Sequence, residues 1–393
     1  MKAPPFSAGR DWSWRSRALR GVLYQVIAVV VLALVVWFVA GNTLDNMRMR
    51  GIQSGFGFLP QTAGFGIGES VLDYDASRSY GRAFAVGISN TLRVAVVGIF
   101  FATMIGTLIG IGRLSANFLV RQLCAAYVEV FRNVPLLVQL FMWYFVLTAL
   151  LPPVSDALQP AAGVYLSQGG LQFPIPDWGH AQLWVTLGFV IGCAAAWIYH
   201  RWAMHERQRT GRARILQWPT VGLLIATGPL LGWLAGGAPT AIDRPEPGDF
   251  NISGGGALTP EYMTLLIGLT LYTAAFIAEI VRGGMLSVPA GQTEAARALG
   301  LSRGYILRLV VLPQALRVIV PPLTSQYLNL TKNSSLAVAI GYPDLVSVSN
   351  TILNQTGRAV ECIFIIMAVY LTLSLLTAGI MNWYNRRVAI KER

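Results

Sequence analysis

Charged residues are scarce in this chain of 393 residues: only 12% are Asp, Glu, Lys or Arg, whereas 54% are hydrophobic. A soluble domain carries about 25% charged residues. Several apolar runs of about 20 residues are long enough to cross a bilayer as helices, which satisfy their own backbone hydrogen bonds there. The composition therefore excludes an ordinary soluble domain and predicts an all-α polytopic membrane protein.

Cysteine is also rare, and histidine offers no alternative metal site. Cys124, Cys193 and Cys362 are isolated and lie in or beside apolar runs, so neither a disulfide framework nor metal-ligand spacing is available. We expect these cysteines to be small buried apolar side chains. His200 and His205 stand at i and i+5, which is poor helical spacing for a pair of metal ligands. No metal site is predicted.

Two common enzyme motifs are missing. The dipeptide Gly-Lys does not occur, so the chain lacks the G-x-x-x-x-G-K-[ST] loop that cradles the phosphates of ATP. H-E-x-x-H, the zinc-binding motif of metalloproteases, is absent as well. We therefore predict no catalytic residue and no cofactor on this chain. If ATP drives the protein, another subunit has to bind it.

The net charge of +12 comes mainly from arginines in short segments between apolar runs, the distribution expected of cytoplasmic loops. The basic stretch 201–214 can also contact anionic lipid headgroups, but a topology signal is the simpler interpretation. The apolar run 22–40 is too long for a signal-peptide core, so we expect it to stay as the first helix. Both termini are predicted to be cytoplasmic, and 41–86, 152–182 and 236–260 external. About eight membrane helices are predicted, at 22–40, 88–112, 127–151, 183–199, 216–235, 262–278, 309–330 and 362–382.

A polar segment rich in small residues, 279–313, separates two apolar runs and should lie outside the bilayer. Thr293 is the predicted N-cap of a short helix, because Glu294 then lies in the first turn, where a carboxylate suits the helix dipole. Gly300 is placed to end this helix, and Ser302 to cap a second one. A helix this short is marginal by itself, so we expect it to dock on a partner.

This segment carries the pattern E-A-A-x3-G-x9-V-x-L-P, in which the final proline should kink the second helix. It resembles the EAA loop of ABC-importer permeases, with Val310 in place of isoleucine. The stretch 127–139 resembles the polar amino-acid branch of that family, the histidine and glutamine permeases. In the family this loop is a coupling helix that inserts into a cleft of a separate ATPase. The resemblance thus assigns ATPase coupling to Glu294, Ala295, Ala296, Gly300, Leu312 and Pro313.

The resemblance implies a five-helix permease core with an extra N-terminal helix and a two-helix insert, as in the lengthened general L-amino-acid subfamily. The expected parts are an N-terminal tail, helix and periplasmic segment (1–84), the first part of the core (85–151), the insert (152–258), and the second part of the core with the coupling loop (259–393, loop about 283–308).

The resemblance also implies the protein's function, location and partners. These are ATP-driven import of polar or general L-amino acids across the bacterial inner membrane, a homologous second permease subunit, two ATPase subunits that hold ATP and Mg²⁺, and a periplasmic amino-acid-binding protein. Membrane lipid is the remaining partner, and no nucleic acid is expected.

Ionisable residues near the membrane are hypotheses for function by default. Glu279 and Arg282, at i and i+3, are expected to form a structural ion pair, and Glu129 and Arg132 a second one. Lys332 is one of only three lysines and stands in a polar stretch where a helix leaves the core. That stretch either lines the substrate path or caps the membrane interface. The residues proposed for the path are Asn329, Lys332, Asn333, Ser334, Ser335 and Glu361.

Two other classes of membrane protein fit the sequence less well. An ion-gradient-driven secondary transporter would show paired repeats and carboxylates within its apolar runs, and such carboxylates are nearly absent here. A membrane-anchored receptor or scaffold would need a sizeable soluble domain, for which no loop is long enough. The permease of an ATP-driven importer is the favoured hypothesis.

Overall fold

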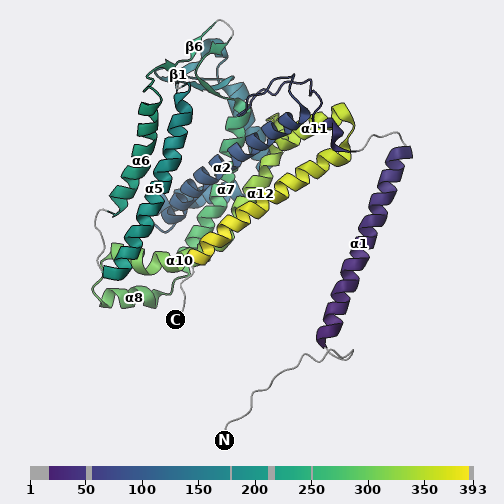
Figure 1. Cartoon of the computed structure of the whole chain (residues 1–393). Coiled ribbons are helices and arrows are strands. Elements are labelled where there is room, and N and C mark those ends of the chain that lie inside the picture. Colours follow the sequence, from purple (N-terminus) through teal and green to yellow (C-terminus); the bar gives the residue numbers. More distant parts are fainter. Residues whose placement is uncertain (1–16, 50–54, 178, 211–216, 249–250, 389–393) are drawn as a thin grey trace. The chain divides into compact units, whose positions relative to one another are not determined.

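The computed structural model describes residues 17–49, 55–177, 179–210, 217–248 and 251–388, and long helices dominate this part of the chain (Figure 1). The described residues form two compact units. The first contains the chain up to Ala95, Tyr327–Val338 and the chain from Pro343 onwards; the second contains Val96–Gln326 and Ala339–Tyr342.

Each of the eight predicted stretches contains a helix, but the number of membrane spans is smaller by length and composition. Six helices of the described chain qualify, and a seventh span results if α3 and α4 are counted as one. The apolar part of α6 (Gln217–Ala235) is too short to qualify. A count of eight is therefore not confirmed. Five of the six helices are α1 (Arg17–Met49), α2 (Tyr80–Gly112), α5 (Ala181–Thr210), α7 (Pro260–Leu286) and α12 (Ala359–Val388). The sixth is the continuous helical run Arg303–Ile340, whose longest part is α10 (Leu312–Asn333).

The first unit has a core built from segments far apart in the sequence. The short helix η1 (Phe56–Phe58) and the start of α2 pack against α11 (Leu345–Thr356) and the start of α12. Helix α11 was not predicted; it ends at Gly357, whose φ is 67°. The 3₁₀ helix η5 (Ser334–Ile340) precedes it. The buried core residues are Phe58, Ala63, Tyr80, Ala83, Phe84, Leu345, Val348, Ile352 and Cys362.

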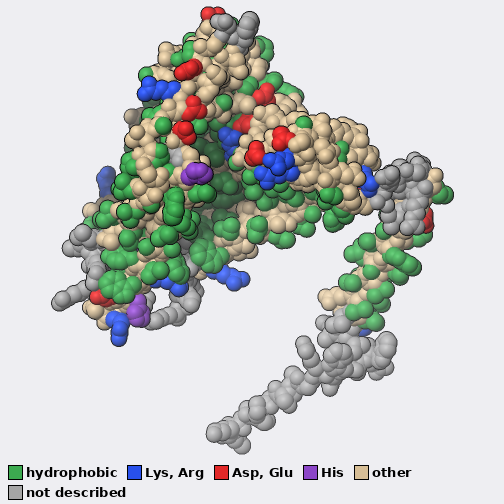
Figure 2. Space-filling model, turned by 45° about the horizontal axis from the view of Figure 1, so that its top comes forward, with side chains coloured by type: hydrophobic (Ala, Val, Ile, Leu, Met, Phe, Trp, Pro, Cys, Tyr) green, Lys and Arg blue, Asp and Glu red, His purple; other side chains and the backbone are tan. Residues whose placement is uncertain are grey.

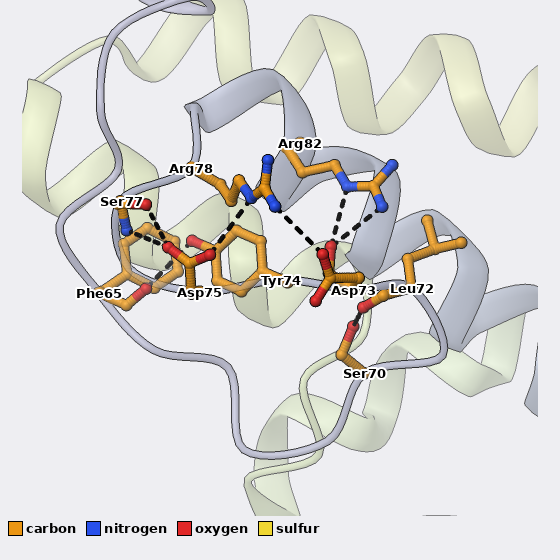
Figure 3. Close-up of polar contacts among 9 residues, drawn as sticks. All are labelled: Phe65, Ser70, Leu72, Asp73, Tyr74, Asp75, Ser77, Arg78 and Arg82. Carbon is orange, nitrogen blue, oxygen red and sulfur yellow. Dashed lines mark hydrogen bonds and ion pairs between the residues drawn. The ribbon is translucent and has the colours of Figure 1, made fainter.

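The segment before α2 has little regular secondary structure, yet ion pairs and hydrogen bonds order it (Figure 3). Arg78 pairs with Asp73 at 3.1 Å and with Asp75 at 3.2 Å. The Arg82 guanidinium donates twice to the Asp73 carbonyl oxygen, at 3.1 and 3.0 Å. The Tyr74 hydroxyl donates to the Phe65 carbonyl at 3.0 Å. This segment was predicted to be external, and its exposed charged side chains suit an aqueous surface.

In the second unit a proline breaks the predicted third helix into α3 (Phe118–Asn133) and α4 (Leu136–Phe145), which meet at 104°. Pro135 disfavours the helical conformation of the residue before it, and Val134 is extended. The break frees backbone carbonyls, and the Gln139 amide donates to those of Phe131 and Val134, both at 2.9 Å. A π turn, η2 (Val146–Leu150), continues α4.

Helices α2 and α7 approach closely through two glycines four residues apart. A Cβ added at Gly106 would lie 2.8 Å from the Ala274 carbonyl oxygen, and one at Gly110 would lie 2.7 Å from that of Ala278. The facing residues of α7 are buried. Small residues at i and i+4 permit this close packing of membrane helices.

The insert is a glycine-packed helical hairpin that carries small β-sheets (Figure 1). A Cβ at Gly188 would lie 2.2 Å from the Gly228 carbonyl oxygen, so α5 and α6 touch backbone to backbone. Figure 2 shows hydrophobic side chains along the hairpin and acidic ones near the strands.

No strand was predicted, but the two external loops of the insert pair with each other. A four-stranded antiparallel sheet has the order β1-β2-β3-β8, and two-stranded sheets join β4 to β5 and β6 to β7. Strand β8 leads directly into α7, so the sheet is attached to the second part of the predicted core. The strands are β1 (Leu158–Ala161), β2 (Val164–Ser167), β3 (Gly170–Phe173), β4 (Ile175–Pro176), β5 (Ile242–Asp243), β6 (Glu246–Pro247), β7 (Ile252–Ser253) and β8 (Gly256–Leu258).

Candidate functional site

The loop after α7 begins with a short helix, α8 (Ala290–Ala298), that starts earlier than predicted. Its N-cap residue is Pro289 rather than Thr293. Thr293 lies inside the helix, where its hydroxyl donates to the Ala290 carbonyl at 2.7 Å. The prediction failed because Ala290 and the two residues after it already extend the helix towards Pro289, which has no backbone N–H that a helix would need to satisfy.

Gly300 forms the corner that ends α8. Its φ is +75°, the left-handed region that suits glycine. Its N–H donates to the Arg297 carbonyl at 2.9 Å, and the Leu301 N–H donates to that of Ala296 at 3.2 Å. These two bonds make a Schellman motif, which satisfies the last carbonyls of the helix. After the corner, Ser302 occupies the predicted N-cap position of α9 (Arg303–Ile306), but its side chain makes no capping hydrogen bond.

The corner presents an exposed face to any partner. Glu294 and Ala295 are exposed, and Leu299 is 81% exposed, which is unusual for a large apolar side chain beside a helix corner. Ala296 is only 4% exposed and holds α8 against the rest of the second unit. The exposed side chain of Leu299 and the carboxylate of Glu294, both carried by this short helix and its corner, suit insertion into a complementary cleft of a partner.

A π turn, η4 (Leu307–Val311), joins α9 to α10 just before the predicted kink. Pro313 has no N–H to offer the preceding turn, and a widened turn is one way for a helix to accommodate this. Leu312 is 40% exposed and Pro313 half-buried. The motif residues thus stand on one continuous path from the exposed helix α8 into α10.

A three-residue ion cluster lies where α7 approaches the loop. The Arg282 Nε donates to Glu279 Oε1 at 3.1 Å, and Arg113, at the end of α2, pairs with Glu279 Oε2. The contact between Arg113 and Glu279 was not predicted, because the two residues are 166 positions apart in the sequence. The cluster joins the inner ends of α2 and α7.

Glu129 and Arg132 do not form the predicted ion pair. The Arg132 guanidinium lies over the Phe276 ring, 5.1 Å from its centroid, and Glu129 accepts a hydrogen bond from the Asn133 amide at 3.4 Å. The prediction failed because an aromatic face on a neighbouring helix offers a planar guanidinium a stacking partner.

The residues predicted for the substrate path do not all face the same way. Asn329 and Lys332 are exposed and Asn333 is half-buried, at i, i+3 and i+4 on α10. Ser334 is buried, and its hydroxyl donates to the Thr331 carbonyl at 2.7 Å. The half-buried Ser335 bonds to the Lys332 carbonyl at 2.7 Å. Glu361 is 5% exposed and accepts a hydrogen bond from the Gly55 N–H.

Asp344 is a buried carboxyl that sequence reasoning did not single out. It is the N-cap of α11, where Oδ1 accepts from the Ser347 N–H at 2.9 Å. The Tyr370 hydroxyl is 3.5 Å from Oδ2. Asp344 lies between the candidate spans, and burial raises its pKa to about 7. The short Tyr-Pro-Asp turn resembles any exposed turn in sequence, so its burial was not foreseeable.

We expect Asp344→Asn to remove a pH dependence of stability. Because the folded pKa is raised, the folded state holds this proton more tightly than the unfolded state. The free energy of unfolding should therefore fall as pH rises from about 4 to about 7, and level off above that. Asparagine is neutral throughout and caps a helix equally well.

The measurement is the unfolding temperature of the detergent-solubilised protein between pH 5 and pH 8. The wild type should lose stability across this interval, while the variant should be flatter and more stable at pH 8. A variant that keeps the full wild-type slope would show that another group titrates.

Comparison with known proteins gives consistent matches. Residues 223–390 match the family model described as "Binding-protein-dependent transport system inner membrane component". The chain is 49% identical to the general L-amino acid transport system permease protein AapQ of Rhizobium johnstonii, over 98% of this chain and 97% of that one. It is 46% identical to the putative amino-acid ABC transporter permease protein YhdX of Escherichia coli, over 97% of each.

Among solved structures, the chain matches the one described as "Crystal structure of an amino acid ABC transporter with histidines". The TM-score is 0.46 and the identity 20%, over 78% of this chain and 95% of that one.

Proposed function

The chain belongs to the inner membrane components of binding-protein-dependent transport systems, the permease subunits of ABC transporters, and on this premise we propose that it carries α-amino acids of broad side-chain range into the cell. The proposal is supported by the names of the two relatives, which match nearly the whole chain. A permease of this family is a membrane subunit without enzymatic activity, and its place is the inner membrane. Family membership also favours ATP over an ion gradient as the source of energy.

We propose that α8 is the coupling helix. The observation that carries this is the exposed corner at Gly300, with Glu294, Ala295 and Leu299 on its surface and a continuous helical path through Pro313 into α10. A permease of this kind works with an ATPase and a substrate-binding protein. ATP and Mg²⁺ would be held by two ATPase subunits, and their closure would push α8 and move α10.

We propose a homologous second permease as the remaining subunit, because residues of a second subunit would have to enclose the translocation path on its other side. We propose that Asn329, Lys332 and Asn333 line this path, since polar and charged side chains on an exposed helix face within a candidate span are poorly suited to lipid. Ser334, Ser335 and Glu361 would act behind this face, holding the chain where α10 ends.

We propose that both termini are cytoplasmic. The arginines near the end of α5 and the coupling loop would share that side, and the acidic strands of the insert would lie in the periplasm. Exposed residues support this arrangement within the second unit: Arg201 and Arg209 lie at one end of α5, whereas Asp243 and Glu246 lie on the strands.

The test is to tag this chain, extract it in mild detergent, and identify stoichiometric partners by mass spectrometry. We expect an ATPase and a second permease, and we expect uptake of L-glutamine by the reconstituted complex to need ATP and the binding protein. Recovery of the chain alone, with uptake that survives ATP depletion but collapses with the ion gradient, would overturn the proposal in favour of a secondary transporter.

A further inference from the structure

Arg317 stands inside a candidate membrane span and forms no ion pair with any described residue. It stands on α10 within the span Arg303–Ile340 and is half-buried. Its Nε and Nη2 atoms are buried and have no hydrogen-bond partner among the described residues. A buried guanidinium in this state is costly, and an ionisable group at membrane depth indicates function by default. Arg113 and Arg282, by contrast, both pair with Glu279.

Two consecutive prolines follow one helical turn later. Pro321 and Pro322 lie inside α10 and have no backbone N–H. In a regular α-helix these N–H groups would bond to the carbonyl oxygens of Arg317 and Val318. Both acceptors therefore lose their usual donors within a candidate span. Such backbone is tolerated at membrane depth where it lines a cavity or finds another donor.

This part of α10 is open on the proline side within the second unit. Val318 is 48% exposed, and Pro321, Pro322 and Ser325 are exposed too, at i, i+3, i+4 and i+7 on one helix face. The adjoining flank of the helix is closed, because Ala315 and Ile319 are buried and a Cβ at Gly284 of α7 would meet both residues. A solute reaching the proline face would meet the freed acceptors beside an unpaired guanidinium.

We propose that Arg317 and the carbonyl oxygens freed by Pro321 and Pro322 bind the carboxylate and ammonium groups common to all α-amino acids. A guanidinium holds a carboxylate through two parallel hydrogen bonds. Backbone carbonyl oxygens that lack their helical donors can accept hydrogen bonds from an ammonium group. The site rests on the proposed function and deepens it. Recognition of the shared zwitterion, rather than of the side chain, is what a carrier of many amino acids requires.

Arg317→Gln tests this in the purified complex of permeases and ATPase without the binding protein. The probe is radiolabelled L-glutamine, displaced by unlabelled L-glutamine or by its α-amide, which lacks the carboxylate. We expect the wild type to bind L-glutamine more tightly than the amide. The variant should bind L-glutamine about 10- to 100-fold more weakly, the range for losing hydrogen bonds to a charged group, and should no longer distinguish the two.

Two further variants sharpen the result. Arg317→Lys keeps the charge but not the planar fork, so it should restore part of the affinity. Arg121→Gln removes one charge from an exposed arginine of α3 in the same unit and should bind like the wild type. Equal discrimination against the amide in wild type and Arg317→Gln would overturn the inference.

Thermal stability without ligand provides a second readout. Because two guanidinium nitrogens have no partner among the described residues, Arg317→Gln should leave the unfolding temperature of the complex unchanged or raise it. A marked decrease, or loss of the second permease from the complex, would mean that Arg317 pairs with a protein carboxylate, and the inference would be wrong. Failure of the wild type to import any amino acid with ATP would instead overturn the proposed function.

Discussion

Replacing Gly300 by valine is expected to lower ATP-driven uptake at least about tenfold while the assembled complex still hydrolyses ATP. The corner has φ +75°, and a Cβ there would meet no atom within 4 Å, so crowding is not the problem. The cost lies in the backbone, because a β-branched residue at positive φ is an outlier and the left-handed region costs about 1–2 kcal/mol for an ordinary residue. That is enough to open a corner held by two hydrogen bonds.

Opening the corner would change the direction in which α8 points relative to α9 and α10. The docked helix would then no longer pass the movement of the ATPase into the membrane. Uptake per ATP hydrolysed, measured in proteoliposomes, is the relevant quantity. Gly304→Val is the matched control: it also has open space and lies four residues further on, but its φ is not positive. Equal coupling in both variants would contradict a mechanical role for the corner.

Much of this loop was predictable because its determinants are local. A glycine after a short apolar stripe predicts a left-handed C′ residue, and Gly300 has that conformation. The start of α8 was misplaced because a favourable N-cap residue, Thr293, was preferred over Pro289. Here continuity of the helix across four more residues outweighed the preference for a hydroxyl cap.

The features that were missed are mostly non-local. Strand β3 pairs with β8 through Leu171 and Leu258, which are separated by the whole α5–α6 hairpin, and strands this short carry no period of their own. The contact of Arg113 with Glu279 depends on how α2 and α7 pack, which no single segment encodes. The break before Pro135 is different, because the proline was visible and its effect on the preceding residue is general.

Gly106→Ala is expected to destabilise the protein, although alanine is the better helix former. Gaining helix propensity is worth about 1 kcal/mol. Against this, the new methyl group would lie 2.8 Å from the Ala274 carbonyl oxygen and 2.7 Å from the Ile277 Cβ, so α2 and α7 must separate. Overpacking of this kind costs about 1–3 kcal/mol, occasionally more. The net effect should be a lower unfolding temperature in detergent, and a larger decrease when Gly110→Ala is added.

Gly379→Ala is the matched control, because Gly379 is also a helical glycine of a candidate span but has nothing within 4 Å of its Cβ position. The same change should be neutral or stabilising there. The two α2 variants should also lose uptake, because the same packing brings Arg113 to Glu279 shortly before α7 enters the loop that leads to α8. Gly106→Ala with wild-type stability would mean that α2 and α7 do not pack through these glycines, and the link from helix packing to the coupling loop would fail with it.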